Sequence, residues 1–498
     1  MTVESFEKRL LDERARMKPT QEMIRARIRK HARGPRSRQI LLDALESESL
    51  GHLDFALFAC PPVIDHGKGA ILWDVDGNEY VDCHAGFAVC ALGHGNTEIG
   101  QAIASQLGRV SQFAELPMEI RAELARRMAA RFPGGTPAKV FFGVTGGEAV
   151  EIAMKVVRWY TGKPLILTQY GDYHGRTSGA MGLTSKAFML AYNWPVPPGD
   201  QAIIRFPFAY CYRCPYDKTY PDCNIYCVHA LERQFESKEA PFRNPMAGVS
   251  NVAAILVEPF QASAGYIIPP FEYLQRLAAL AEAYDILFVS DEVQAGMGRT
   301  GRMWAIEHAN VVPDLLTTAK SLSNGLPMSL VIGRPEILDS WGPGAHSTTF
   351  AGYPAAAAGA NKVLDIFERD HVIENASERG RYFLNGLRRL AEEHPSVGDT
   401  QGTGLFLAIE LVRDRETKEP ASEETSWASQ ECLNKGLICI SSGYYSNRLC
   451  FAPPLVITEA EIDRALEALD DVIGAMERRF GLRPTRRPKG TTPQGRSM

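Results

Sequence analysis

The sequence predicts an α/β protein whose largest domain is built on a mostly parallel sheet, and two observations support this prediction. Between about residues 100 and 350, helical patterns alternate with short apolar runs that have the length of buried strands. After residue 350 the pattern changes to helices with a few strands, which is typical of a smaller α+β domain. The chain has 498 residues, more than one ordinary domain, so two or three domains are expected.

Four apolar runs in the central region have the character of buried strands: Lys139–Phe142, Ala253–Val257, Ile286–Ser290 and Leu315–Thr318. A helical pattern through Val157 follows the first run, and another across Phe271–Tyr284 follows the second. Strands that alternate with helices in this way favour a parallel sheet with helices packed against it.

The flanking regions are predicted to form an arm, a divided small domain and a tail. Residues 1–50 are rich in Arg, Glu and Leu and are expected to be a helical arm. Residues 51–100, with a hairpin at 70–83, and residues 356–481 are expected to form the two parts of the small domain. The large domain is then expected to span 101–355. Residues 482–498 have few apolar side chains, which predicts a disordered tail.

Composition limits the classes of function. Hydrophobic residues make up 45% and charged residues 23%, which is ordinary for a soluble globular protein. The net charge of −5 gives no electrostatic reason to expect nucleic-acid or membrane binding. No apolar run approaches the roughly 18 residues of a membrane helix. The first residues lack the apolar stretch of a secretory signal, so a cytoplasmic location is expected.

A glycine pair, Gly146-Gly147, stands between the predicted strand at Lys139–Phe142 and the helix that follows it. Free N–H groups at a helix N-terminus bind anions, and glycine lets a phosphate approach the backbone closely. The same glycines would also suit a tight strand-to-helix turn. This loop alone therefore does not identify a phosphate site.

Two charged side chains follow further predicted strands. Asp291 lies at the carboxyl end of a buried strand, where open α/β sheets place ligands, and it could pair with a protonated heterocyclic nitrogen or serve as a helix cap. Lys320 directly follows another strand; partial burial would favour Schiff-base chemistry, although such a lysine could also extend to solvent. Together with the glycine loop, these are the components of a site for pyridoxal 5′-phosphate (PLP).

In its motifs and their order, the chain resembles class III (ω-type, subgroup II) aminotransferases of PLP fold type I over about residues 55–480. The matching segments are Asp74–Gly77, Tyr80–Asp82, Gly93-His94, Thr145–Ala149, Tyr173–Thr177, Glu258–Gln261, Asp291–Gln294, Gly298–Gly301, Lys320 and Thr349–Pro354. The resemblance implies a large domain with a mostly parallel sheet of the seven-stranded type. It also implies a smaller α+β domain formed by the N- and C-terminal segments.

The resemblance also implies roles for single residues. Gly146 and Gly147 would bind the phosphate, and Tyr173 would stack on the cofactor ring beside His174 and Glu258 of the same motif set. Asp291 would hold the pyridine nitrogen, Val293 would pack on the opposite ring face, and Gln294 would lie near the phenolic oxygen. Lys320 would carry PLP as a Schiff base. Thr349 would reach the phosphate of the partner subunit, which implies a homodimer with shared active sites and leaves a tetramer open.

Three positions depart from the family pattern. Gly147 replaces the usual Ser or Thr, Tyr353 stands where Asn or His is usual, and Gln401 stands where many members have an Arg that binds a substrate carboxylate. Arg176 or Arg448 could supply that contact instead. Five side chains are candidates to line the substrate pocket: Phe58, Phe87, Tyr173, Tyr353 and Gln401.

The predicted activity is transfer of an amino group from an amine or (ω-)amino acid to a 2-oxo acid by a ping-pong mechanism. A PLP-dependent racemase or epimerase and a decarboxylating transaminase are alternatives, because one fold supports all of these reactions. A non-catalytic binding protein on the same fold is a further alternative. Lys320, Asp291, Tyr173 and Thr349 together argue against it.

Four cysteines form a cluster with the pattern C-x2-C-x8-C-x3-C inside an insert at residues 208–230. Cys211, Cys214, Cys223 and Cys227 are predicted to hold a structural zinc ion, with an iron–sulfur cluster as the alternative. The thiols could equally pack among the tyrosines of the insert or form disulfides.

Overall fold

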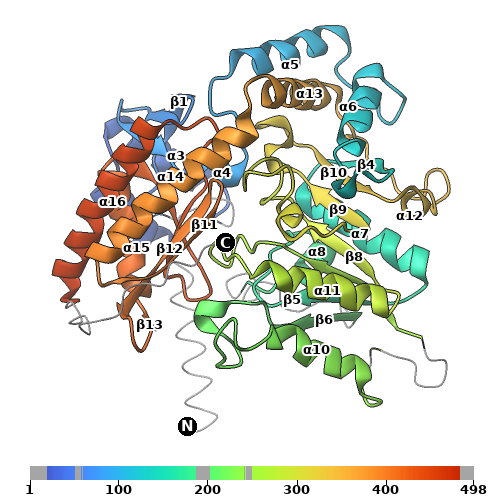
Figure 1. The fold of residues 1–498 in the computed structure, drawn as a ribbon. Coiled ribbons are helices and arrows are strands. Elements are labelled where there is room, and N and C mark those ends of the chain that lie inside the picture. The colour runs from blue at the N-terminus through green and yellow to red at the C-terminus, as the bar shows by residue number, and fades with distance from the viewer. Residues whose placement is uncertain are drawn as a thin grey trace.

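The structure is a computed structural model that describes residues 20–50, 58, 60–186, 202–240, 242 and 249–482. Residues 1–19 of the predicted arm and all but the first residue of the predicted tail lie outside these ranges. Figure 1 shows a large part built around one sheet and, beside it, a second part that contains both the N-terminal hairpin and the C-terminal helices. The domain limits themselves stay a prediction.

The large part contains a seven-stranded sheet with the order β4-β10-β9-β8-β7-β5-β6. These strands are β4 (Lys139–Gly143), β5 (Leu165–Gln169), β6 (Ile203–Phe206), β7 (Val252–Val257), β8 (Leu287–Asp291), β9 (Leu315–Thr318) and β10 (Ser329–Gly333). The pairs β6-β5, β5-β7, β7-β8 and β8-β9 are parallel, whereas β10 is antiparallel to both of its neighbours. The predicted fold class is therefore confirmed.

Helices cover both faces of this sheet, which explains why its central strands β7, β8 and β9 are buried along their whole length. In β7, Ala254 and Leu256 pack with the apolar side of α7 (Gly146–Thr161), while Ile255 and Val257 join the core on the opposite face with α11 (Phe271–Ala283). The remaining helices of the large part are α5 (Thr97–Arg109), α6 (Glu119–Ala129), α8 (Ser178–Leu183), α10 (Tyr226–Glu236), α12 (Pro335–Leu338) and α13 (Pro354–Arg369). Figure 1 shows α5, α6 and α13 packed together beyond β4 and β10.

The second part joins segments from the two ends of the chain. The hairpin of β2 (Ile71–Asp74) and β3 (Glu79–Asp82) forms a sheet with β1 (Ile64–Lys68) and with β14 (Leu437–Ile438), and β14 runs parallel to β3. A second sheet contains β11 (Val397–Thr403), β12 (Phe406–Asp414), β13 (Glu419–Pro420), β15 (Ile440–Ser442) and β16 (Arg448–Phe451). The pairing of β3 with β14 confirms that N- and C-terminal segments build the smaller unit together.

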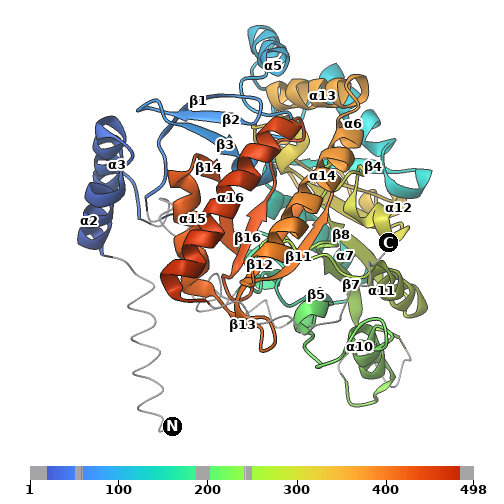
Figure 2. The same cartoon turned by 60° about the vertical axis from the view of Figure 1, so that its left-hand side comes forward.

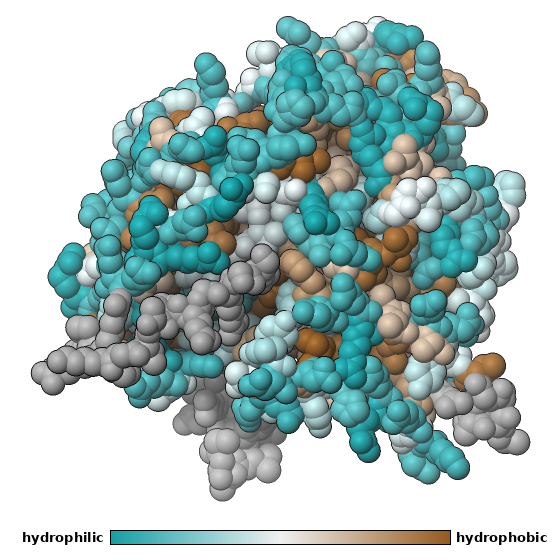
Figure 3. Space-filling view, in the orientation of Figure 1, coloured by the Kyte–Doolittle hydropathy of each residue, from teal (hydrophilic) through white to brown (hydrophobic). Residues whose placement is uncertain are grey.

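Five helices pack on these sheets or beside them: α2 (Gln21–His31), α3 (Pro35–Ser47), α14 (Val372–Glu393), α15 (Ser422–Asn434) and α16 (Glu459–Phe480). Figure 2 shows α14 and α16 lying over the sheet of β11, β12 and β16, with α2 and α3 at the outer edge. The short α4 (Ala85–Ala88) follows β3. No helix among the described residues is long and apolar enough to cross a membrane. Figure 3 shows a mostly hydrophilic face with small apolar groups between the polar ones.

Candidate active site

A cavity of about 550 Å³ lies where the loops after β4, β5, β8 and β9 meet. Carboxyl ends of parallel strands converge at one edge of a sheet, which is where α/β folds place their ligands. The structure brings nine of the ten predicted cofactor-site residues to the wall of this cavity: Gly146, Gly147, Tyr173, His174, Glu258, Asp291, Val293, Gln294 and Lys320.

The N-terminus of α7 faces this cavity through its glycines. Thr145 caps the helix, its Oγ1 accepting a hydrogen bond of 3.2 Å from the Glu148 N–H. A Cβ atom at Gly146 would lie 2.8 Å from Val293 Cγ1, so this position has no room for a side chain. A Cβ at Gly147 would lie 3.2 Å from Thr177 Oγ1. Thr177 also lines the cavity and places a hydroxyl where the side chain of residue 147 would otherwise be.

Asp291 ends β8 as a buried acceptor of three hydrogen bonds. Its Oδ1 accepts from the Val293 N–H at 3.1 Å and from Thr317 Oγ1 at 2.9 Å. Its Oδ2 lies 2.6 Å from His174 Nδ1. Burial by itself lowers the pKa of His174, but hydrogen bonds to Asp172 and Asp291 outweigh it and raise that pKa to about 10. The cavity wall therefore carries a carboxylate backed by an imidazolium.

Glu258 adds a second buried carboxyl group to the wall. Its two oxygens accept hydrogen bonds from the backbone N–H groups of Tyr173, at 2.6 Å, and Ala262, at 2.9 Å. Burial and the nearby charge of Asp172 raise the pKa of Glu258 to about 8. Glu258 thus fixes the backbone of Tyr173 and brings a titratable group close to Lys320.

Lys320 begins a short 3-10 turn, η5 (Lys320–Ser323), with a strained backbone φ of +32°. Its amine donates a hydrogen bond to Gln294 Oε1, and the Gln294 amide donates to Tyr266 Oη at 3.0 Å. Burial lowers the pKa of the Lys320 amine to about 8, against the opposing charges of Glu258 and Asp291. A lysine with a lowered pKa is more often present as the neutral amine, which is the nucleophilic form.

Thr349 is the predicted residue that does not line the cavity within one chain. Its carbonyl oxygen accepts a hydrogen bond of 2.8 Å from Gln112. Of the five candidate pocket residues, Tyr173 lines this cavity, whereas Phe58, Phe87 and Tyr353 do not. Gln401 lines a different cavity of about 1200 Å³, and its Oε1 accepts from the Ile268 N–H at 3.0 Å.

The two candidate arginines differ in their surroundings. Arg448 is fully buried and forms ion pairs of 2.7 Å with Glu410 and 3.4 Å with Asp399. Arg176 lines the cofactor cavity and is exposed. Of these two arginines, Arg176 is therefore the one that faces the cavity.

Sequence reasoning missed Asp172 and Thr177 as parts of this site. Thr177 was part of the matched segment, but no role was predicted for it. Asp172 stands two positions before His174, and its position beside the aromatic-His-Gly motif was the available signal. Its meaning depends on the loop that turns it inward, which the sequence pattern does not reveal.

The prediction of a metal at Cys211, Cys214, Cys223 and Cys227 is not supported. The four residues surround one small cavity of about 20 Å³, together with Tyr220 and Tyr226. In the part of the chain that the structure describes, no group of three or more His, Cys, Asp or Glu side chains is arranged to hold a metal ion.

Comparison with known proteins agrees with this geometry. The model of the family "Aminotransferase class-III" matches residues 58–473. The 5-aminovalerate aminotransferase of Pseudomonas aeruginosa is 36% identical over 82% of this chain and 92% of its own. The leucine/methionine racemase of Thermococcus litoralis is 34% identical over 84% and 91%. A solved Bacillus anthracis aminotransferase has a TM-score of 0.79 at 29% identity and covers 89% of this chain and 100% of its own.

The chain belongs to the class III aminotransferase family and is a PLP-dependent aminotransferase of fold type I.

Proposed function

We propose that this aminotransferase takes its amino group from an amine or ω-amino acid and passes it to a 2-oxo acid in two successive half-reactions. The observation that carries this proposal is the cavity wall, which places Lys320, Asp291 and the glycine-rich start of α7 around one space. Among the described residues of that wall, Arg176 is the one arginine. It would bind a carboxylate of the donor or acceptor.

The residues present fit PLP. The N–H groups of Gly146 and Gly147, with the Thr177 hydroxyl, would hold the phosphate at the N-terminus of α7. Asp291 would hold the protonated ring nitrogen, Tyr173 and Val293 would enclose the ring, and Gln294 would face the phenolic oxygen. When bound, PLP supplies an electron sink for charge that develops on the substrate carbon.

The protein's own residues would bind and orient the substrate, and one of them would move a proton. Arg176 would fix the substrate carboxylate at the mouth of the cavity. Lys320 Nζ, with its lowered pKa, would accept the proton from the substrate carbon that bears the amino group and would deliver it to the second carbon bonded to that nitrogen. Glu258 would hold the Tyr173 backbone in place through its hydrogen bond of 2.6 Å.

The proposed assembly is a homodimer with shared active sites, and a tetramer would build on it. Thr349 lies outside the cavity of its own chain, as a residue that serves a partner's phosphate would. The segment between α5 and α6 exposes Phe113 at 62%, and Phe350 is exposed at 57% close to Thr349. Large exposed apolar side chains near Thr349 favour a protein–protein interface there.

A racemase or epimerase is the second candidate, because a leucine/methionine racemase is similar over most of its length. Incubation of the purified enzyme with an amino donor and no oxo acid distinguishes amino transfer from racemisation. A transaminase converts its bound PLP to pyridoxamine phosphate and releases one oxo product per site. Racemisation without stoichiometric oxo product would contradict the proposal. Lys320→Ala serves as the inactive control, and 5-aminovalerate and leucine are suitable first donors.

A further inference from the structure

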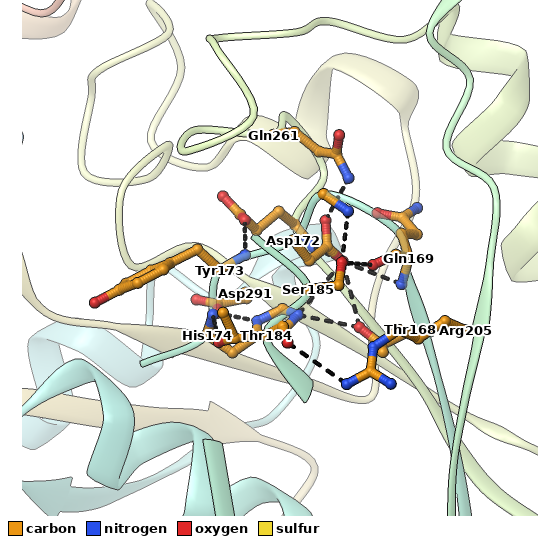
Figure 4. A network of polar contacts seen from close by, with 12 residues as sticks. Thr168, Gln169, Asp172, Tyr173, His174, Thr184, Ser185, Arg205, Gln261 and Asp291 are labelled. Atoms are coloured by element: carbon orange, nitrogen blue, oxygen red, sulfur yellow. Dashed lines mark hydrogen bonds and ion pairs between the residues drawn. The ribbon is translucent and has the colours of Figure 1, made fainter. Parts of the chain in front are cut away.

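A chain of buried polar side chains extends behind the cavity, away from the space for the cofactor. Figure 4 shows it running from Asp291 through His174 to Asp172 and on to Gln261. Asp172 follows β5 and is fully buried. Its carboxylate is surrounded by donors: Gln261 Nε2 lies 2.7 Å from Oδ1, and the N–H groups of Gln169 and Glu258 each lie 3.4 Å from Oδ2.

His174 lies between two carboxylates. Its Nδ1 is 2.6 Å from Asp291 Oδ2, and its Nε2 is 3.4 Å from Asp172 Oδ2. Thr168 Oγ1 lies 3.2 Å from His174 Nε2 and 3.4 Å from Asp172 Oδ2, so this hydroxyl bridges the ring and the second carboxylate. Both ring nitrogens therefore face an oxygen, which is the arrangement that suits a doubly protonated imidazole.

The charges of Asp172, His174 and Asp291 depend on each other. A buried carboxylate is costly unless it is paired and hydrogen-bonded, and His174 supplies the positive charge that Asp172 faces. In return, the two carboxylates keep His174 protonated against the effect of burial. With one proton on Nδ1, His174 donates to Asp291 and leaves the other Asp291 oxygen bonded to Thr317 and Val293.

We propose that Asp172 is a positioning residue of the cofactor site, which orients the His174 ring from its Nε2 side so that Nδ1 stays directed at Asp291 Oδ2 and the Asp291 carboxyl group stays aimed at the cavity. This inference rests on the proposed role of Asp291 toward the ring nitrogen. Asp172 itself touches neither substrate nor cofactor. It acts through His174, whose Nε2 lies 3.4 Å from its Oδ2. Burial raises the pKa of the Asp172 carboxyl group, and the hydrogen bonds from His174 and Gln261 oppose that rise.

Other titratable or charged groups lie around the polar side chains that run from Asp291 to Gln261, and they affect how the protonation of His174 depends on pH. These groups are Glu258, Lys320, Tyr273, Tyr444 and Arg205. Glu258 and Lys320 have pKa values of about 8, so both titrate near neutrality. A measurement on His174 alone is therefore needed, because the pH profile of activity combines all of these groups.

The experiment follows the His174 Nδ1 proton by NMR in the apoenzyme, with His174→Gln assigning the signal. In the wild type we expect this signal to hold its position through neutral pH. Asp172→Asn keeps the shape and removes the charge, and we expect it to lower the pKa of His174 by about 1–3 units. The control is Asp74→Asn. Asp74 is a buried carboxylate in β2 that accepts hydrogen bonds of 2.8 Å from Tyr80 and Asn78 and lines neither large cavity.

A His174 pKa in Asp172→Asn equal to that of the wild type would overturn the inference. If this variant fails to fold, the same His174 pKa is measured in Asp172→Ser, which keeps an acceptor for Gln261, and the same result would overturn the inference. In the loaded enzyme, the absorbance of bound PLP should acquire a new pH-dependent step in the Asp172 variants and none in Asp74→Asn. Because the NMR measurement uses the apoenzyme, it tests the link between Asp172 and His174 even if the proposed amino transfer fails its own test.

Discussion

At the scale of single residues, the site shows how one position compensates for another. Gly147 stands where the family usually has a Ser or Thr, so this position has no hydroxyl group to offer a phosphate. The structure places Thr177 Oγ1 3.2 Å from where a Cβ of residue 147 would be. The loop after β5 approaches so closely that a Cβ on Gly175, at φ +137°, would lie 2.7 Å from the Gly147 Cα. If the phosphate binds at this helix N-terminus as proposed, the Thr177 hydroxyl would take the place of a hydroxyl on residue 147.

Substitution of Thr177 tests this compensation. Thr177→Ala should weaken PLP binding by about 10- to 150-fold, since one hydrogen bond to a charged group contributes about 1.5–3 kcal/mol. Gly147→Ser combined with Thr177→Ala should recover part of the loss, because the new hydroxyl would occupy the space that Thr177 vacates. Equilibrium titration of the apoenzyme with PLP measures both effects. Unchanged affinity in Thr177→Ala would show that this hydroxyl does not bind the phosphate.

At the scale of helices and strands, the sequence predicted the elements that have strong periodic patterns. The run Ile286–Ser290 corresponds to β8 with a shift of one residue, which makes Asp291 the last residue of the strand. By contrast, β14 (Leu437–Ile438) and β15 (Ile440–Ser442) are almost continuous along the chain and yet pair in different sheets. Apolar composition predicts burial, but it does not reveal which partner strand a residue will meet.

Close contacts between backbones are another feature that the sequence did not reveal. Gly380 lies within α14, where a Cβ atom would come within 2.0 Å of the Gly404 carbonyl oxygen. Gly100 lies within α5 and has nothing within 4 Å of the same position. Nothing in the sequence distinguishes these two helical glycines, yet close packing requires a glycine at position 380 and not at position 100.

The two glycines make a matched pair for a stability measurement. Gly380→Ala should destabilise the fold by about 1–3 kcal/mol, because the added methyl group must displace backbone. Gly100→Ala should stabilise it by about 0.5–1 kcal/mol, since alanine favours a helix. Denaturant unfolding of both variants measures the difference. Equal effects at the two positions would contradict the close approach of α14 to Gly404.

At the scale of the whole molecule, the sequence predicted the sheet of the large part, and it predicted that N- and C-terminal segments form the smaller part together. The motifs also identified nine cofactor-site residues that the fold brings to the wall of one cavity. The cysteine cluster shows the limit of such reasoning. Its spacing suits a metal site, yet the fold of the insert sets the four side chains around a small cavity lined by Tyr220 and Tyr226. Spacing shows which ligands are available, but the arrangement of the side chains in the fold decides whether they can hold a metal ion, and no such group is found among the described residues.

The central claim is that Lys320 carries PLP. Borohydride reduction of the loaded enzyme, followed by proteolysis and mass spectrometry, identifies the lysine that is bonded to the cofactor. We predict a single phosphopyridoxyl group on the peptide that contains Lys320, and none on that peptide in Lys320→Ala. A modified lysine elsewhere in the wild type, or an unmodified Lys320 in an enzyme that retains bound PLP, would contradict the account.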